Sequence, residues 1–145
     1  MQPRFKGGRI IVAADESLSV VQHFLRWDMV GAAATELAAR REVRFPPAVH
    51  FAAIDGADAS LDGFANLVDL PEHAEVLGPV PLPHGQTLPG EYDSQRFGPP
   101  QRLVIRTPLG PRSQLGRALR SANAARSARK DDLPLRIIVD PIHVG

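Results

Sequence analysis

RFGPPQRLVIRTPLGPRSQLGRALRSANAARSARK, residues 96–130, joins an alternating segment to an amphipathic one and contains no Asp or Glu. Its first half predicts a half-buried strand over residues 101–107, because Leu103 and Ile105 share one face. The residues on the opposite face of this strand are Arg102, Val104 and Arg106. A basic strand followed by a basic helix is therefore the centre of the expected fold.

The second half of this stretch predicts a helix that opens at Pro111, since proline suits the first helical position, where its missing N–H is not needed. Apolar side chains recur on one face of this helix, at Leu115, Ala118, Leu119 and Ala122. Arg117 and Arg120 lie on the far side. The helix is therefore expected to pack against a core and to present charge to solvent.

The basic residues of this stretch are the strongest charge feature of the chain. They are Arg96, Arg102, Arg106, Arg112, Arg117, Arg120, Arg126, Arg129 and Lys130. Residues 45–95 contain no Lys or Arg, so the net charge of +1 conceals an acidic and a basic region. Clustered arginines are typical of polyanion binding, because each one near a phosphate releases a condensed counterion. The alternative is a solvated surface without a ligand, in an Arg-rich composition of the kind that GC-rich coding produces.

The length of 145 residues fits one domain, or one compact domain with a fragment of another. Hydrophobic residues make up 43% and charged residues 23%, which indicates a soluble globular protein with no membrane partner. No run approaches the roughly 20 apolar residues of a membrane span. Cysteine is absent, which excludes disulfides and thiolate metal sites. Since the amino terminus lacks an apolar signal segment, a cytoplasmic, nucleoid-associated location is expected.

The strand and helix patterns between the first prolines and the chain end predict the fold class. They are a strand at residues 48–54, a helix capped by Ser60, a strand at residues 75–80 and a last strand at residues 135–139. A Gly-Pro pair inside the second of these strands favours an edge strand or a bulge, because proline cannot donate to a central ladder. With the basic strand and helix, the order is β-α-β-β-α-β. This order predicts a ferredoxin-like α+β fold, the split βαβ pattern, with helices on one face of an antiparallel sheet.

The amino-terminal residues predict a separate set of elements. Residues 9–14 form an apolar run that is expected to be a buried strand, although it has no sheet of its own to join. Ser17 is expected to cap a first helix, and a second helix is expected at residues 30–41. The acidic pair Asp15 and Glu16 is interpreted as capping chemistry, because no third polar group is placed to support catalysis.

Chemical motifs are missing from the sequence. It contains no phosphate-binding loop, dinucleotide fingerprint, nucleophile elbow or metalloprotease motif. The histidines are scattered singly, at His23, His50, His73, His84 and His143. A base-stacking RNA-recognition platform would need aromatic residues on the central strands, which supply only Phe51. No catalytic residue, metal or cofactor is therefore expected in this chain.

Three segments of the chain resemble a known family. They are ELAARREVRFPPAVH at residues 36–50, EVLGPVP at residues 75–81 and IIVDPI at residues 137–142. In this order they are similar to the carboxy-terminal region of the bacterial replication restart protein, primosomal protein N′ (PriA). The resemblance implies that residues 1–44 are the remnant of a second helicase lobe with connecting helices, and residues 45–145 a PriA-type carboxy-terminal domain.

The resemblance also implies a function. Members of this family are ATP-dependent DNA helicases that recognise stalled replication forks, bind branched or single-stranded DNA, contact other primosome proteins and help reload the replicative helicase. The Arg-rich composition resembles the actinobacterial branch, in which the helicase motifs are degraded. The family's ATP and zinc sites fall outside this sequence, so the chain is expected to be a non-enzymatic DNA-binding and scaffold domain.

Arginines are the expected contact residues. The DNA-binding candidates are Arg96, Arg102, Arg106, Arg112, Arg117 and Arg120. In the family a basic residue at the start of the last helix helps to receive the acidic tail of the single-stranded-DNA-binding protein (SSB), and the apolar register implies this role for Arg112. The alternative function is a small ferredoxin-like regulatory or protein-interaction module that does not bind DNA.

Overall fold

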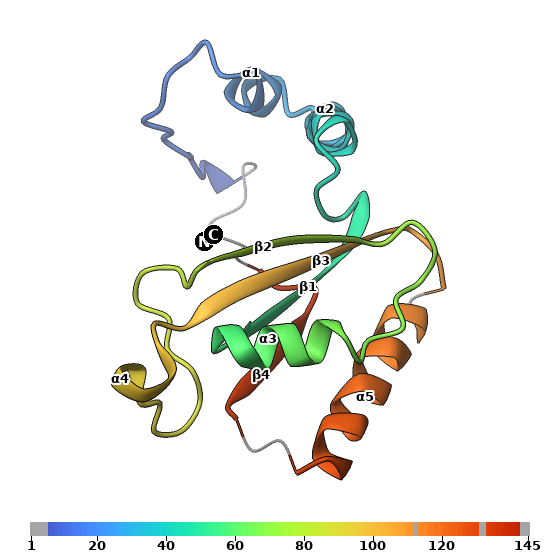
Figure 1. The fold of residues 1–145 in the computed structure, drawn as a ribbon. Coiled ribbons are helices and arrows are strands. Elements are labelled where there is room, and N and C mark those ends of the chain that lie inside the picture. Colours follow the sequence, from blue (N-terminus) through green and yellow to red (C-terminus); the bar gives the residue numbers. More distant parts are fainter. Residues whose placement is uncertain (1–5, 112, 131–132, 143–145) are drawn as a thin grey trace. The chain divides into compact units, whose positions relative to one another are not determined.

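A computed structural model gives the structure of residues 6–111, 113–130 and 133–142 (Figure 1). The chain forms two compact units, Met1–Ala39 and Arg40–Gly145, called the N-terminal unit and the C-terminal unit below. The boundary between these compact units, after Ala39, lies earlier in the chain than the predicted domain boundary after residue 44. No helix in the described ranges is long and apolar enough to cross a lipid bilayer.

The helical part of the N-terminal unit consists of α1 (Ser19–Leu25) and most of α2 (Met29–Glu42), whose last residues lie past the boundary after Ala39. Between them, His23 Nδ1 lies 3.0 Å from Asp28 Oδ2, and His23 Nε2 lies 3.3 Å from Thr35 Oγ1. Asp28 also accepts the backbone N–H of Gly31 at 2.8 Å, and this bond is the main cause that lowers the pKa of Asp28. These contacts fix the two helices to each other.

Residues 9–14, predicted to be a buried strand, form no strand, and Ile11 is 92% exposed. An apolar run forms a strand only where a neighbouring strand accepts its backbone hydrogen bonds. The described part of the N-terminal unit contains no other strand. The prediction of a buried strand is therefore wrong, because this segment has no sheet to join.

The predicted cap at Ser17 is also wrong. Helix α1 begins at Ser19, and the residue in the capping position is Leu18, which makes no side-chain bond to the helix. Ser17 instead donates its backbone N–H to Asp15 Oδ1 at 2.8 Å. The acidic side chain thus closes a turn before the helix, and this bond lowers the pKa of Asp15.

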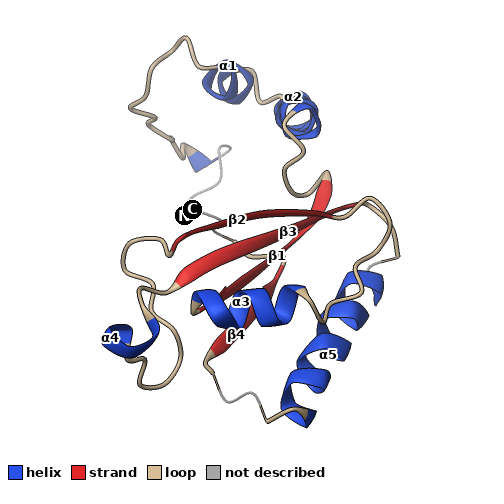
Figure 2. Cartoon of the chain, viewed as in Figure 1, coloured by secondary structure: helices blue, strands red, loops and turns tan. Residues whose placement is uncertain are grey.

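The C-terminal unit is built on one antiparallel sheet (Figure 2). Its strands are β1 (Val49–Gly56), β2 (Glu75–Pro81), β3 (Gln101–Pro108) and β4 (Leu135–Val139). They lie side by side in the order β2-β3-β1-β4, and every pair is antiparallel. This order confirms the predicted ferredoxin-like α+β fold.

Helices α3 (Asp58–Ala65) and α5 (Ser113–Ala128) cover one face of the sheet (Figures 1 and 2). The core lies between the helices and the sheet, and its buried residues are Ala52, Ile54, Leu61, Phe64, Leu103, Ile105, Leu115, Leu119 and Ala122. The predicted inward face of β3 is therefore confirmed, and that of α5 is confirmed at Leu115, Leu119 and Ala122, whereas Ala118 is half-buried and lies outside the core. A short helix, α4 (Ser94–Phe97), was not predicted.

Ser60 does not cap α3, in contrast to the prediction. The helix begins at Asp58 with Ala57 in the capping position, so that Ser60 lies inside the helix and is fully buried. Its hydroxyl has no hydrogen-bond partner among the described residues. Leu61 and Phe64 of this helix still pack into the core.

Strand β2 is both an edge strand and bulged, as the Gly-Pro pair predicts. The pairing with β3 shifts between Leu77 and Val80. Gly78 lies in this shift at φ +101°, and a Cβ atom there would meet the Arg102 carbonyl oxygen at 2.9 Å. Only glycine fits this position, because both its φ and the close strand exclude a side chain.

Candidate nucleic-acid interface

The sheet face opposite α3 and α5, called the arginine face below, receives both predicted contact residues of β3. Leu103 and Ile105 point into the helix-covered core, so Arg102 and Arg106 point the other way. Arg102 is only 1% exposed. Its Nε donates to Asp55 Oδ1 at 2.7 Å and its Nη2 to Asp55 Oδ2 at 3.0 Å. The sheet register brings these two residues together, because Asp55 on β1 pairs directly with Arg102.

A second arginine completes this group. Arg136 on β4 also pairs with Asp55 across the sheet, and its Nε donates to Asp55 Oδ2 at 2.9 Å. Gln86 Oε1 accepts from Arg102 Nη2 at 2.6 Å, and the Thr87 carbonyl accepts from Arg136 Nη1 at 2.9 Å. The group of Asp55, Arg102, Arg136 and Gln86 is called the Asp55 cluster. It ties three strands to the loop that follows β2.

Arg106 belongs to a similar group on the same face, the Glu75 cluster. Its Nε donates to Glu75 Oε2 at 3.1 Å, and Arg44 donates to the other carboxylate oxygen. Hydrogen bonds from Arg106 and then Arg44 lower the pKa of Glu75. Only 16% of the Arg106 side chain is exposed. The arginine face is thus held by two groups in which a carboxylate lies between two arginines.

The two predicted arginines of α5 that the structure describes differ from those of β3. Arg117 and Arg120 are exposed, and neither forms an ion pair with a carboxylate of the described ranges. Arg96 is also exposed, and its guanidinium lies 4.9 Å from the centre of the Phe97 ring. Arg112, the remaining candidate, lies outside the described residues. The structure therefore brings Arg117 and Arg120 together on one helix and separates them from Arg102 and Arg106.

Arg126 is not among the predicted DNA-binding residues, and its side chain stabilises the fold. It is 5% exposed, and its Nη2 donates to the Leu133 carbonyl at 2.7 Å, which ties the end of α5 to the segment before β4. The sequence holds a signal for this position, because Arg126 follows Leu115, Leu119 and Ala122 on the inward face at helical spacing.

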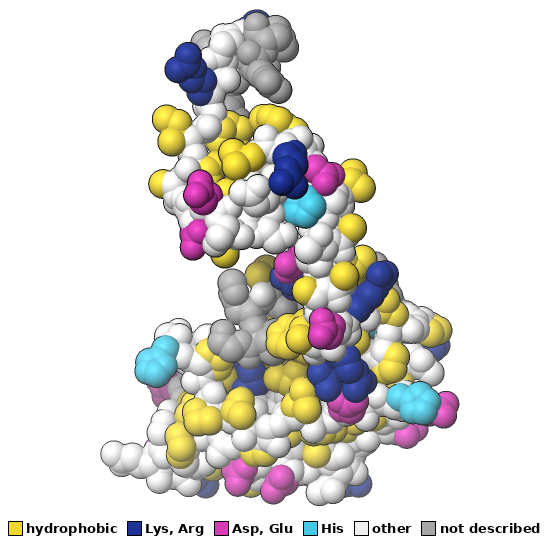
Figure 3. Space-filling model, turned by 90° about the horizontal axis from the view of Figure 1, so that it is seen from above, with side chains coloured by type: hydrophobic (Ala, Val, Ile, Leu, Met, Phe, Trp, Pro, Cys, Tyr) yellow, Lys and Arg dark blue, Asp and Glu magenta, His cyan; other side chains and the backbone are white. Residues whose placement is uncertain are grey.

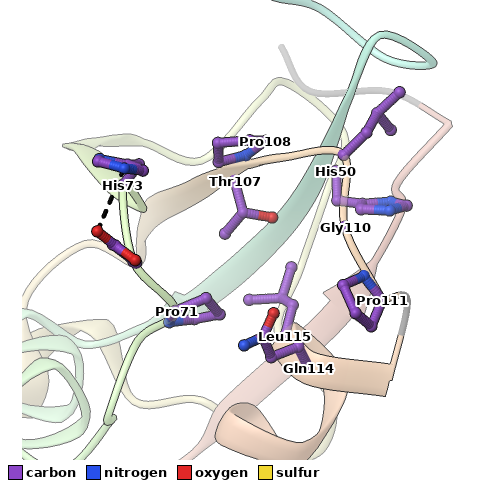
Figure 4. Close-up of a pocket in the computed structure, with 11 residues that line it drawn as sticks. His50, Pro71, His73, Thr107, Pro108, Gly110, Pro111, Gln114 and Leu115 are labelled. Atoms are coloured by element: carbon purple, nitrogen blue, oxygen red, sulfur yellow. Dashed lines mark ion pairs between the residues drawn. The ribbon is translucent and has the colours of Figure 1, made fainter.

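A cavity of about 230 Å³ lies beside the start of α5 (Figure 4). Its lining comes from the start of β1, the end of β3, the segment before β2 and the first turn of α5: His50, Pro71, Glu72, His73, Thr107, Pro108, Leu109, Gly110, Pro111, Gln114 and Leu115. His73 Nε2 lies 3.4 Å from Glu72 Oε1 at its rim. Leu115 forms an apolar wall, whereas Thr107 and Gln114 supply polar groups. The cavity therefore suits a ligand with both apolar and polar parts.

No group of three or more His, Asp or Glu side chains in the described ranges is placed to hold a metal ion. Of the described histidines, His50 and His73 line the same cavity, whereas His23 is in the N-terminal unit. His50 Nδ1 lies 3.6 Å from Asp140 Oδ1.

Comparison with known proteins matches the C-terminal unit to one domain family. The primosomal protein N C-terminal domain matches residues 41–142. The chain is 37% identical over 145 residues to the probable replication restart protein PriA of Mycobacterium leprae, which covers 100% of the chain and 22% of that relative. It is 36% identical over 152 residues to the probable replication restart protein PriA of Mycobacterium tuberculosis, covering 100% of the chain and 23% of the relative.

The chain thus spans less than a quarter of the length of these curated relatives. The similarity includes the N-terminal unit, which lies entirely before the matched domain. The matched domain, in turn, contains all four strands of the antiparallel sheet and both helices that cover it. The chain belongs to the family of the primosomal protein N C-terminal domain, found in replication restart proteins PriA.

Proposed function

We propose that the C-terminal unit is a non-enzymatic DNA-binding and scaffold domain of a replication restart protein, which recognises stalled forks and helps reload the replicative helicase. Family membership supports the role in replication restart. The observation that carries DNA contact is the outer side of α5, where Arg117 and Arg120 are exposed without a carboxylate partner among the described residues. Being three positions apart on a helix, they can reach neighbouring phosphates.

The contact surface consists of the exposed arginines. Arg117, Arg120 and Arg96 bind phosphates, and Arg112 is a further candidate outside the described residues. Arg102 and Arg106 hold the opposite face of the sheet together rather than contact DNA, because a phosphate would have to displace their bonds to Asp55 and Glu75. Phosphate contacts position a protein on DNA without reading bases, so no sequence preference is expected.

Binding of the full chain to a three-way junction, a duplex and a single strand tests this function. Fluorescence anisotropy at several salt concentrations gives the affinity for each DNA. The logarithm of the affinity is expected to fall linearly with the logarithm of the salt concentration, by about 0.9 for each duplex phosphate contacted. Affinity that does not depend on salt would instead favour the alternative, a protein-interaction module.

We also propose that the cavity beside the start of α5 receives the acidic tail of SSB. The first turn of a helix offers backbone N–H groups and a positive dipole end, which attract carboxylates, although the Gln114 N–H here already donates to the Pro111 carbonyl at 2.8 Å. Leu115 and Pro111 provide apolar walls for an apolar tail end. Glu72 at the rim opposes the charge of the tail, so binding to this chain is expected to be weak.

Titration of a labelled SSB tail peptide tests this site. Gln114 lines the cavity and is exposed, so Gln114→Glu repels the tail while its charge favours the helix start. Arg112→Glu removes the predicted cation. Both variants are expected to weaken binding, whereas Arg129→Glu, near the other end of the helix, is the matched control. Equal affinity in all three variants would place the site elsewhere.

The N-terminal unit, we propose, is the remnant of a helicase lobe. Its large apolar side chains are exposed in the described structure, with Val20 at 63%, Trp27 at 56% and Val30 at 82%, and Figure 3 shows apolar side chains grouped at the surface. Contiguous exposed apolar patches are typical of interfaces. Amide hydrogen exchange tests this role in the full chain: residues 10–12 are expected to be less protected than residues 137–139. Equal protection would contradict it.

A further inference from the structure

The outer edge of β4 has no strand partner among the described residues, because β4 ends the order β2-β3-β1-β4. The hydrogen bond from Asp140 N to Phe51 O, at 2.8 Å, identifies the backbone groups that face β1. Bonded positions alternate in an antiparallel pair, so Arg136 and Ile138 also bond to β1. Leu135, Ile137 and Val139 therefore direct their N–H and C=O groups outward.

The two edges of the sheet differ in how they are protected. Strand β2 contains Pro79 and Pro81 and a register shift, and all three hinder the addition of another strand. Strand β4 has none of these features: its residues LRIIV include no proline, and its pairing with β1 is continuous. The edge of β4 is thus the one that remains able to accept a strand.

A groove of about 470 Å³ runs between this edge and α5. Its lining consists of Gly116, Leu119, Arg120, Asn123, Ala124, Ile137 and Val139. Ile137 and Val139 present their side chains to the groove, and Val139 is 49% exposed. On the helix side, Gly116 and Ala124 leave room for the side chains of an added strand.

The charges around the groove indicate what it binds. Arg120 is the charged residue of its lining, and residues 113–130 contain no Asp or Glu. Pairing with β4 of a second copy would bring two basic α5 helices side by side, and like charges would oppose this arrangement. A strand with an acidic side chain would instead meet Arg120 as an opposite charge.

We propose that the edge of β4 and this groove bind an extended segment of a partner protein as a fifth, antiparallel strand. The backbone of the segment bonds to Leu135, Ile137 and Val139, as in other complexes formed by strand addition. Its side chains opposite these residues lie over the groove. The central one is an Asp or Glu that pairs with Arg120, and its neighbours on that face are apolar.

The peptide Thr-Val-Thr-Glu-Thr-Val-Thr is the probe, because Val, Glu and Val share one face of a strand. Titration into the isotope-labelled full chain, without DNA, is expected to shift the amide signals of Leu135, Ile137, Val139 and Gly116. N-methylation of the Val and Glu residues blocks the edge that faces β4 and is expected to abolish the shifts. N-methylation of the two inner Thr residues is the matched control and preserves them, because these amides face away.

Charge reversal tests the recognition of the acidic side chain. Arg120→Glu is expected to weaken binding of the Glu peptide at least about threefold and to favour a peptide with Lys in its place. Arg117→Glu makes the same charge change on the same helix away from the groove and is expected to preserve the preference. Shifts confined to the cavity beside Pro111, or binding that N-methylation of Val and Glu leaves unchanged, would overturn the proposal. Since no DNA is present, such a failure leaves the proposed DNA contact intact.

Discussion

The arginines of β3 and those of α5 come from one uninterrupted basic stretch, yet they occupy different environments. Arg102 is 1% exposed and bonds Asp55 with two nitrogens, whereas Arg117 is exposed and forms no ion pair with a carboxylate of the described residues. The difference arises from the neighbours. A strand places each residue opposite a residue of the next strand, while the outer side of α5 faces solvent. A run of like charges therefore does not by itself identify a binding surface.

The largest effect is expected from Asp55→Ala, which leaves Arg102 and Arg136 together without their carboxylate. Removal of one member of a buried ionic group costs about 3–5 kcal/mol of unfolding free energy. Urea unfolding followed by circular dichroism measures this change. Asp62→Ala, on the exposed side of α3, is the control and is expected to change the free energy by less than about 0.5 kcal/mol. Equal effects of the two variants would contradict the structural role of the Asp55 cluster.

A direct comparison of Arg102→Ala with Arg117→Ala sharpens the contrast between strand and helix. Loss of Arg102 is expected to cost about 2–3 kcal/mol, since hydrogen bonds to a buried carboxylate are lost while Arg136 remains bound to Asp55. Loss of Arg117 is expected to change stability by no more than about 0.5 kcal/mol. The same urea experiment measures both. A large loss of stability in Arg117→Ala would contradict this contrast, because it would show that the Arg117 side chain forms stabilising contacts within the protein.

For DNA binding we expect the reverse of the stability result: loss of the exposed arginines of α5 has the larger effect, and loss of Arg102 the smaller one. The double variant Arg117→Ala with Arg120→Ala removes two proposed phosphate contacts, so the salt slope for duplex DNA is expected to decrease by about 1.8. Arg26→Ala, an exposed arginine of the N-terminal unit, is the control for the loss of charge. An unchanged salt slope in the double variant would show that Arg117 and Arg120 of α5 do not contact the DNA phosphates.

The smallest effect is expected from the titration of Glu75. Bonds from Arg106 and Arg44 hold its pKa below the ordinary value of 4.5, so Glu75 stabilises the fold fully above that pH. This contribution is lost as the pH falls through the lowered pKa, because protonation removes the charge that both arginines bind. Glu75→Gln is therefore expected to be less stable than the natural chain at pH 7 and to approach its stability in acid. A difference that is constant with pH would contradict this assignment.

The order of elements in the C-terminal unit could be predicted because each signal is local. Alternation identified the strand around Leu103 and Ile105, and proline placed β2 at the edge. The segment at residues 9–14 was misread for the opposite reason, since its strand would need a partner that the unit does not supply. The predicted caps at Ser17 and Ser60 are wrong because residue types that favour capping also occur near a helix start without capping it. Ser17 lies before the capping position of α1, and Ser60 lies inside α3.

The candidate site could be predicted less fully. Asp55 and Arg102 are 47 positions apart, and only the register of β1 against β3 brings them together. Each residue alone gives no sign of this pairing. The exposed arginines of α5 could be predicted, because helical spacing relative to Leu115 and Leu119 is enough to place them on the outside. The environment of Arg112 stays a prediction, because it lies outside the described residues.

The Asp55 cluster also restricts which strand alignments the sheet can adopt. A slip of β3 by one residue would turn its apolar side chains away from the core, so hydrophobic alternation already opposes it. A slip by two residues keeps every side chain on its own face, and alternation alone does not prevent it. Such a slip would place Val104 opposite Asp55 and leave a buried carboxylate and a buried guanidinium without each other. One aspartate between two arginines can thus distinguish the native alignment of three strands from misaligned sheets with equally good apolar packing.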